Sequence, residues 1–241
     1  ITVFSLIFLL TISFISVNKV QANTDLAPQS QSAVLIDAKT GQILFEKNKQ
    51  DRLAPASVTK VMTLLLIVEA LEQGKIRLEE EVTASPEACR MGGSQIWLEP
   101  GEKMKVEDLI ISIALQSAND SSYALAEHIA GSHENFVKMM NDKAKEFKMN
   151  NTNFVNCHGL DAEGHYTSAE DIAIMSRELA KHPQIFKWTS MYQYHLREGD
   201  SWLVNTNKLV RFYDGCDGFK TGSTNKAGFC LSATALKDGM R

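Results

Sequence analysis

The strongest constraint on the fold is an almost wholly apolar run. Residues 57–73 read SVTKVMTLLLIVEALEQ, with apolar side chains on nearly every face of a helix, and Gly74 follows as a candidate C-cap. A helix that is apolar all round is buried, so we expect it to run through the centre of the molecule. Ser57 and Lys60 stand at its start. Because an unpaired ammonium is costly to bury, Lys60 either extends to water or is a buried amine that takes a proton from Ser57.

Strands are predicted at both ends of the chain and helices in its middle. Residues 32–48 indicate two strands around a turn at Lys39-Thr40-Gly41. Asp120 and Ser168 are candidate helix N-caps, and Asp171 would complete a capping box with Ser168. The helical patterns lie at about 106–115, 120–130, 133–148 and 168–181, and strand patterns return at about 191–196, 202–204, 216–221 and 227–236.

This order of elements predicts an α/β (α+β) fold. In the economical arrangement, the N- and C-terminal strands join one antiparallel sheet that is packed with helices. A mostly helical subdomain is expected at about 75–165.

The N-terminal segment has a different character from the rest. Residues 1–17 are apolar, and Val20-Gln21-Ala22 place small residues where signal peptidase requires them. We therefore expect a signal peptide at 1–22, a catalytic domain at 23–241 and an exported, extracytoplasmic protein. An uncleaved membrane anchor is the alternative, although about 17 apolar residues is short for a span. The missing initiator Met, and an unfinished turn at Asp238-Gly239, predict that the sequence is incomplete at both ends.

Charge and cysteine content exclude some functions. The net charge is −4 and no long basic block occurs, so nucleic acid is not an expected partner. The four cysteines, Cys89, Cys157, Cys216 and Cys230, match no metal-binding spacing. Cys157-His158 alone is too small a ligand set for zinc, which needs three or four convergent ligands, so no metal site is predicted.

Three short motifs carry the chemistry, and their order and setting matter more than their occurrence. Ser-x-x-Lys and Ser-x-Asn each occur three times in the chain, and Lys-Thr-Gly twice. One combination has each motif in a suitable setting. Ser57–Lys60 opens the central helix, Ser117-Ala118-Asn119 lies between two helices, and Lys220-Thr221-Gly222 ends a late strand. The copies at Ser16, Lys39 and Ser223 lie in the leader, in a hairpin turn and after the strand.

This trio is typical of penicillin-binding proteins and class A β-lactamases. The flanking stretches are LAPASVTKVMTLLL, LQSANDSSYALAEHIAG, NFVNCHGLDAEGHYTSAEDIAIMSREL and DGFKTGSTNKAGFCLSATA. With them, residues 30–241 resemble the low-molecular-mass penicillin-binding proteins, which are D-alanyl-D-alanine carboxypeptidases. The resemblance implies a β-lactamase/D,D-peptidase-like fold and a serine peptidase that needs no cofactor. The implied partners are peptidoglycan stem peptides ending in D-Ala-D-Ala and β-lactams, with membrane association through a C-terminal segment beyond this sequence.

The resemblance also implies a role for each motif residue. Ser57 is the nucleophile and Lys60 its base, with a pKa lowered by burial and by Lys220. Ser117 relays a proton to the leaving amine, and Asn119 orients Lys60 or the substrate. The remaining roles concern substrate binding. Lys220 and Thr221 bind the substrate carboxylate, and Gly222 lets a peptide lie along the strand. The backbone N–H groups of Ser57 and Ser223 form the oxyanion hole.

Three alternatives stay open at this point. A serine β-lactamase would use the same acylation machinery, but this chain carries Ala118 where those enzymes usually carry Asp. We also expect no Glu-x-x-x-Asn segment between Ser117 and Lys220 that would supply a loop glutamate to activate water. A D,D-endopeptidase would use the same chemistry on cross-links. A non-catalytic cell-wall binding protein would keep the fold alone.

Overall fold

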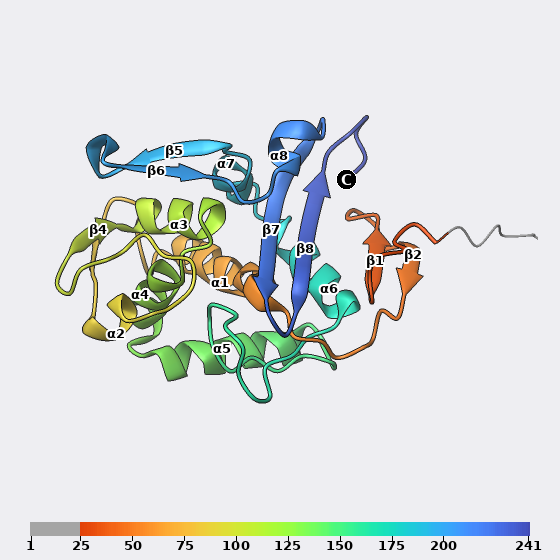
Figure 1. Ribbon diagram of the computed structural model, residues 1–241, viewed down its shortest axis with the longest axis horizontal. Coiled ribbons are helices and arrows are strands. Elements are labelled where there is room, and N and C mark those ends of the chain that lie inside the picture. Colours follow the sequence, from red (N-terminus) through yellow and green to blue (C-terminus); the bar gives the residue numbers. More distant parts are fainter. Residues whose placement is uncertain (1–24) are drawn as a thin grey trace, which may run out of the picture.

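A buried helix lies at the centre of the structure, as the apolar run predicts. The computed structural model describes residues 25–241, so the predicted signal peptide at 1–22 lies outside the described residues. A 3-10 turn, η1 (Ala56–Thr59), leads into α1 (Lys60–Glu72), and every residue from 60 to 68 is buried. Figure 1 shows α1 running behind the strand pair β7–β8 and among the other helices. Ser57 lies in the 3-10 turn and not in the α-helix itself.

Four longer helices surround or flank α1 close to their predicted ranges. They are α3 (Val106–Leu115), α4 (Asn119–Ala130), α5 (His133–Glu146) and α6 (Ala169–Leu179). Ser168 caps α6, because its hydroxyl accepts a hydrogen bond from the Asp171 N–H group. The predicted cap at Asp120 is wrong. Ala118 occupies the N-cap position of α4, and Asp120 is buried in the first turn, where backbone N–H groups of another segment bind its carboxylate.

The longer strands form three antiparallel hairpins. β1 (Ala33–Ile36) pairs with β2 (Ile43–Lys47) around the predicted turn, and β7 (Cys216–Thr224) pairs with β8 (Gly228–Ala235). The third hairpin joins β5 (Gln193–Leu196) to β6 (Ser201–Val204) across η2 (Arg197–Gly199), and lies over α3. The mixture of helices and antiparallel strands matches the predicted α/β (α+β) class.

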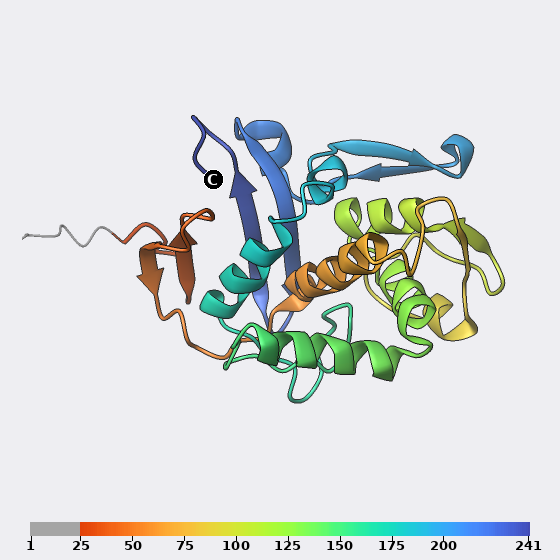
Figure 2. The same ribbon diagram turned by 180° about the vertical axis from the view of Figure 1, so that it is seen from behind.

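The N- and C-terminal strands do not share one sheet within residues 25–241. Each pair forms its own two-stranded ladder. Both views show β1–β2 beside β8 with a space between the ribbons (Figures 1 and 2). The two pairs are joined through α6: Ser176 Oγ lies 2.7 Å from Ser232 Oγ, and Arg177 Nε donates to Ala38 O at 2.8 Å. Among residues 25–241 the two hairpins are therefore linked through α6 and by one backbone hydrogen bond, from the Ala38 N–H group to Arg241 O at 2.7 Å, without a shared ladder.

Six short elements escaped sequence reasoning because they are too short to show a hydrophobic period. They are β3 (Glu81–Thr83), α2 (Pro86–Cys89), β4 (Lys103–Lys105), α7 (Ile185–Thr189), η2 and α8 (Leu209–Phe212). β3 and β4 pair with each other, within the range 75–165 that also holds α2 to α5. The division into a helical subdomain stays a prediction.

Residues 25–241 contain neither a candidate membrane-spanning helix nor a candidate metal site. No described helix combines the length and apolarity that crossing a membrane requires. No cluster of three His, Cys, Asp or Glu side chains suited to a metal ion occurs in that part of the chain, and its four cysteines are free thiols.

Candidate active site

The amine of Lys60 is the centre of the site. It is fully buried one turn after Ser57, and its Nζ lies 3.0 Å from Ser57 Oγ. Two further oxygens face it, Asn119 Oδ1 at 2.6 Å and the backbone carbonyl of His158 at 2.6 Å. An uncharged amine has two N–H groups and one lone pair. With two acceptors for the N–H groups, the lone pair is left for the Ser57 hydroxyl.

Electrostatics favour the uncharged form of this amine. Burial holds the pKa of Lys60 well below its usual value, and the positive charge of Lys220 lowers it further. Both causes are those expected from the sequence. A buried lysine with a depressed pKa next to a serine hydroxyl is the arrangement that a general base requires.

Two glycines allow the backbone to close around Ser57. A Cβ atom on Gly222 of β7 would lie 2.8 Å from Ser57 N, so only glycine lets the strand approach the turn this closely. On the other side, a Cβ on Gly159 would collide with the carbonyl of Ala56, and Gly159 has a φ of +91°. The turn that carries Ser57 is therefore held between β7 and the loop at 156–160.

Asn119 presents its carbonyl oxygen to Lys60 because its amide nitrogen is occupied elsewhere. Nδ2 donates to Gly92 O at 2.6 Å, and the backbone N–H group of Asn119 donates to Ser94 O at 2.7 Å. A loop before α3 thus fixes which way the side-chain amide points.

Ser117 lies between α3 and α4 in a left-handed conformation, with φ +65°. It is buried, and its hydroxyl has no hydrogen-bond partner among residues 25–241. A buried unpaired hydroxyl is uncommon and is a frequent mark of functional sites.

Lys220 and its neighbours line the strand side of the site. Lys220 is 1% exposed, and burial lowers its pKa to about 7. Its Nζ donates to Thr221 O at 3.2 Å, while Thr221 Oγ1 donates to Thr206 Oγ1 at 2.8 Å. Ser223 is exposed on the same strand. The motif lies inside β7, which continues to Thr224, and not at the end of the strand as predicted.

Sequence reasoning missed the His158 carbonyl, because any residue type supplies one. Asn156 shapes this turn: its Oδ1 accepts from the N–H groups of His158 and Gly159, at 3.2 and 2.6 Å. An asparagine two or three residues before a glycine was the available signal. Around the same centre, His165 Nε2 lies 2.8 Å from the Thr59 hydroxyl.

The other copies of the motifs do not bring a second serine–lysine pair to this centre. Lys39 lies in the exposed β1–β2 turn, the copy at Ser223 crosses the tip of β7–β8, and that at Ser16 is outside the described residues. The prediction that no Glu-x-x-x-Asn segment lies between Ser117 and Lys220 is wrong, because this spacing occurs at Glu146–Asn150. Glu146 ends α5, with a 62% exposed side chain 3.1 Å from Lys143 Nζ, and makes no contact with Ser57 in the described structure.

The sequence is similar to known peptidases over nearly all of its length. It matches the family described as D-alanyl-D-alanine carboxypeptidase over residues 18–241. It is 54% identical over 221 residues to the D-alanyl-D-alanine carboxypeptidase DacF of Bacillus subtilis, a match that covers 90% of this chain and 57% of DacF. The chain thus spans little more than half the length of that relative.

The fold is likewise similar to solved structures. The D-alanyl-D-alanine carboxypeptidase DacD from Francisella tularensis superimposes with a TM-score of 0.84 at 29% identity, covering 91% of this chain and 65% of that one. Penicillin-binding protein D2 from Listeria monocytogenes, in its ampicillin-bound form, superimposes with a TM-score of 0.78 at 29% identity. That match covers 88% of this chain and 86% of the D2 chain. The predicted fold class and family are confirmed: the chain belongs to the D-alanyl-D-alanine carboxypeptidase family.

Proposed function

We propose that this chain is the catalytic part of a serine-type D-Ala-D-Ala carboxypeptidase that removes the terminal D-Ala from peptidoglycan stem peptides. The observation that carries the proposal is the hydrogen bonding of Lys60. Three oxygens lie within hydrogen-bond distance of its amine, Ser57 Oγ at 3.0 Å and Asn119 Oδ1 and His158 O at 2.6 Å each. When the uncharged amine donates to the latter two, its lone pair is left for the Ser57 hydroxyl.

The reaction follows from that arrangement. Ser57 Oγ attacks the carbonyl of the penultimate D-Ala, and Lys60 takes the hydroxyl proton. Charge on the carbonyl oxygen is stabilised by the backbone N–H groups of Ser57 and Ser223. The peptide C–N bond then breaks, and the leaving D-Ala receives a proton through Ser117. Water hydrolyses the ester on Ser57 and regenerates the enzyme.

The strand side supplies substrate recognition in this proposal. Lys220, in its protonated form, and the Thr221 hydroxyl meet the terminal carboxylate, and the absence of a side chain at Gly222 lets the peptide lie along β7. β-Lactams, whose amide mimics the scissile bond, acylate Ser57. Because peptidoglycan is built outside the cytoplasm, the protein acts on the outer side of the cytoplasmic membrane, and its association with that membrane is part of the same proposal.

Two measurements test the function. Mass spectrometry of muropeptide pentapeptides incubated with the protein should show loss of one alanine, and a Ser57→Ala variant should not release it. After incubation with benzylpenicillin, peptide mapping should place the covalent adduct on Ser57. An adduct on Ser117, or a folded protein that neither labels nor releases alanine, would overturn the proposal.

A further inference from the structure

A strained turn lies beside the site, in the segment formed by residues 92–98 (the 92–98 segment). Trp97 has a φ of +60°, a region that a bulky residue rarely adopts, and its side chain is 77% exposed. No packing of the indole holds this conformation. Such a turn persists only where surrounding groups fix the backbone, and strain of this kind is common at functional sites.

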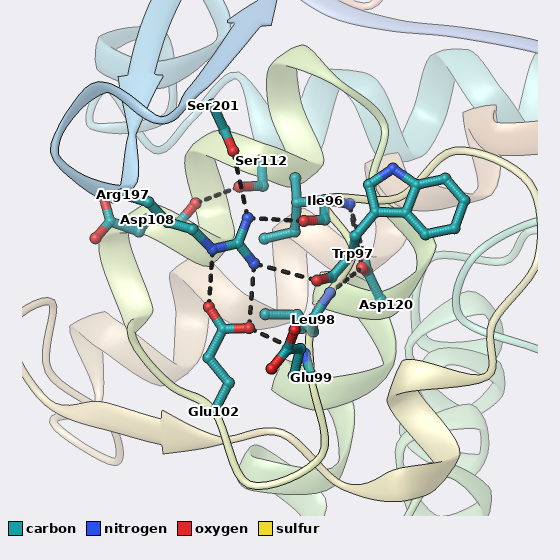
Figure 3. A network of polar contacts seen from close by, with 10 residues as sticks. All are labelled: Ile96, Trp97, Leu98, Glu99, Glu102, Asp108, Ser112, Asp120, Arg197 and Ser201. Atoms are coloured by element: carbon teal, nitrogen blue, oxygen red, sulfur yellow. Dashed lines mark hydrogen bonds and ion pairs between the residues drawn. The ribbon is translucent and has the colours of Figure 1, made fainter.

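Asp120 holds the turn from one side. Its carboxylate is 1% exposed and accepts hydrogen bonds from the backbone N–H groups of Ile96 and Leu98, both at 3.1 Å. These two N–H groups flank Trp97. Figure 3 shows Asp120 lying on the side of the turn away from Arg197.

Arg197, at the tip of the β5–β6 hairpin, holds the turn from the opposite side. Its guanidinium donates to Ile96 O at 2.8 Å and to Trp97 O at 3.3 Å (Figure 3). The same group binds both oxygens of Glu102, at 2.9 and 3.1 Å. Arg197 itself has a φ of +51°. A planar guanidinium group can donate to two carbonyls and a carboxylate at once, and the ammonium group of lysine cannot reproduce this geometry.

The segment held in this way reaches the catalytic centre through its first residues. Gly92 O accepts from Asn119 Nδ2, and Ser94 O accepts from Asn119 N. Asn119 Oδ1 in turn contacts Lys60. If Gly92 O moved away, the amide would be free to rotate and to turn its NH2 group toward the amine, where two donors would face each other.

We propose that Arg197 and Asp120 are positioning residues: they hold the 92–98 segment from both sides and thereby fix the Asn119 amide that orients Lys60. The inference rests on the proposed function for its kinetic consequence, but the restraint on the segment is measurable without activity. The Arg197 contact is the better target for a test, because Asp120 adjoins Asn119 in the chain and is buried.

The test compares Arg197→Lys with a matched control. Arg177→Lys is that control, because Arg177 also donates to two successive backbone carbonyls, those of Ala38 and Lys39, but contacts only the β1–β2 turn. A fluorescent penicillin measures the acylation rate constant and, separately, the fraction of molecules labelled. Arg197→Lys should slow acylation roughly 10- to 100-fold, the range expected for misplacement by up to 1 Å, with the labelled fraction unchanged. Arg177→Lys should leave the rate constant unchanged.

Hydrogen exchange supplies the readout that is independent of activity. Amides in the peptide covering 95–99 should exchange faster in Arg197→Lys and not in Arg177→Lys. A normal rate constant with a reduced labelled fraction would indicate general destabilisation and overturn the proposal, as would unchanged exchange. A wild-type protein that does not label would defeat the proposed function instead, and exchange would still decide whether Arg197 holds the segment.

A second test relieves the backbone strain at Trp97. This test can also be carried out if the Arg197→Lys variant does not fold. Asparagine tolerates a positive φ better than tryptophan does. Trp97→Asn should therefore make the turn less dependent on Arg197, and the Trp97→Asn/Arg197→Lys double variant should fold and label several-fold faster than Arg197→Lys. A double variant that does not fold, or that labels no faster than a folded Arg197→Lys, would contradict the inference.

Discussion

Lys60 and Lys220 are two buried amines with different tasks. Burial lowers the pKa of both, and the charge of Lys220 adds to the effect on Lys60. In the proposed reaction Lys60 must be uncharged to accept a proton, whereas Lys220 must be charged to meet a carboxylate. The proposed reaction therefore requires a pH at which Lys60 has lost its proton and Lys220 still holds one.

Replacement of Lys60 by arginine tests its role as the base. A guanidinium stays protonated in proteins, so Lys60→Arg should lower the acylation rate at least about 100-fold. Lys138→Arg, at an exposed lysine of α5, should have no effect. The measurement is fluorescent-penicillin labelling of variants whose folding is checked by circular dichroism. Near-normal labelling of a folded Lys60→Arg protein would mean that another group takes the proton.

The pH profile tests the charge on Lys220. Because burial lowers the pKa of Lys220 to about 7, kcat/KM on the pentapeptide should fall as the pH rises through this value and the free enzyme loses the charge. Lys220→Arg should retain more activity than Lys220→Gln and should lose the alkaline fall, since arginine stays protonated. Equal kcat/KM for the two variants would show that charge is not what this position supplies.

At the scale of elements, the site depends on a close meeting of a turn, a strand and a loop. η1 carries Ser57, β7 approaches it at Gly222, and the 156–160 loop approaches it at Gly159. The nearest atoms at Gly222 belong mainly to the backbone of Ser57 and Val58, so an added side chain cannot be accommodated by a rotamer change.

Gly222→Ala tests this close approach. The new methyl group would meet Ser57 N at 2.8 Å, push β7 away and displace the proposed oxyanion donors. Acylation should fall at least about 100-fold, the usual effect of losing one such donor. Gly228→Ala is the control, because a Cβ there meets nothing within 4 Å although its φ of +66° is strained for alanine. Comparable acylation rates in the two variants would refute the proposed role of the contact.

At the scale of the whole molecule, a buried neutral histidine makes stability depend on pH. His165 is 4% exposed and its Nδ1 accepts from the Val155 N–H group, so a proton has no room there. Burial lowers its pKa to about 4, against an ordinary 6.5. Between these values the unfolded chain binds more protons than the folded one, so stability falls as the pH drops from about 6.5 towards 4.

Urea unfolding at several pH values checks this expectation. The loss attributable to His165 is about 1.5 kcal/mol between pH 6.5 and pH 5. A His165→Gln variant should be less stable at neutral pH but should show a flatter dependence on pH. His195→Gln, at an exposed position of β5, should keep the wild-type slope. An unchanged slope in His165→Gln would assign the acid sensitivity to other groups.

Local pattern was sufficient for the longer helices and for selecting the candidate motif residues. The central helix follows from an apolar run that has no polar face, and α3 to α6 follow from periodicity and a serine cap. Ser57, Lys60, Ser117, Asn119 and Lys220 were selected as candidates because their residue types stand at recognisable spacings and each motif has a suitable predicted setting. These are properties of neighbouring residues, which a sequence displays directly.

Tertiary structure alone decided the rest, because backbone groups carry no residue-type signal and distant pairings have no period. The carbonyls of His158, Gly92 and Ser94 complete the surroundings of Lys60 and Asn119, yet any residue supplies a carbonyl. Asp120 looked like a helix cap from its position, but a segment more than twenty residues earlier supplies its hydrogen-bond donors. Within residues 25–241, β1–β2 and β7–β8 likewise form separate ladders, with the β1–β2 turn and β8 both contacting α6, and strand sequences do not reveal such contacts.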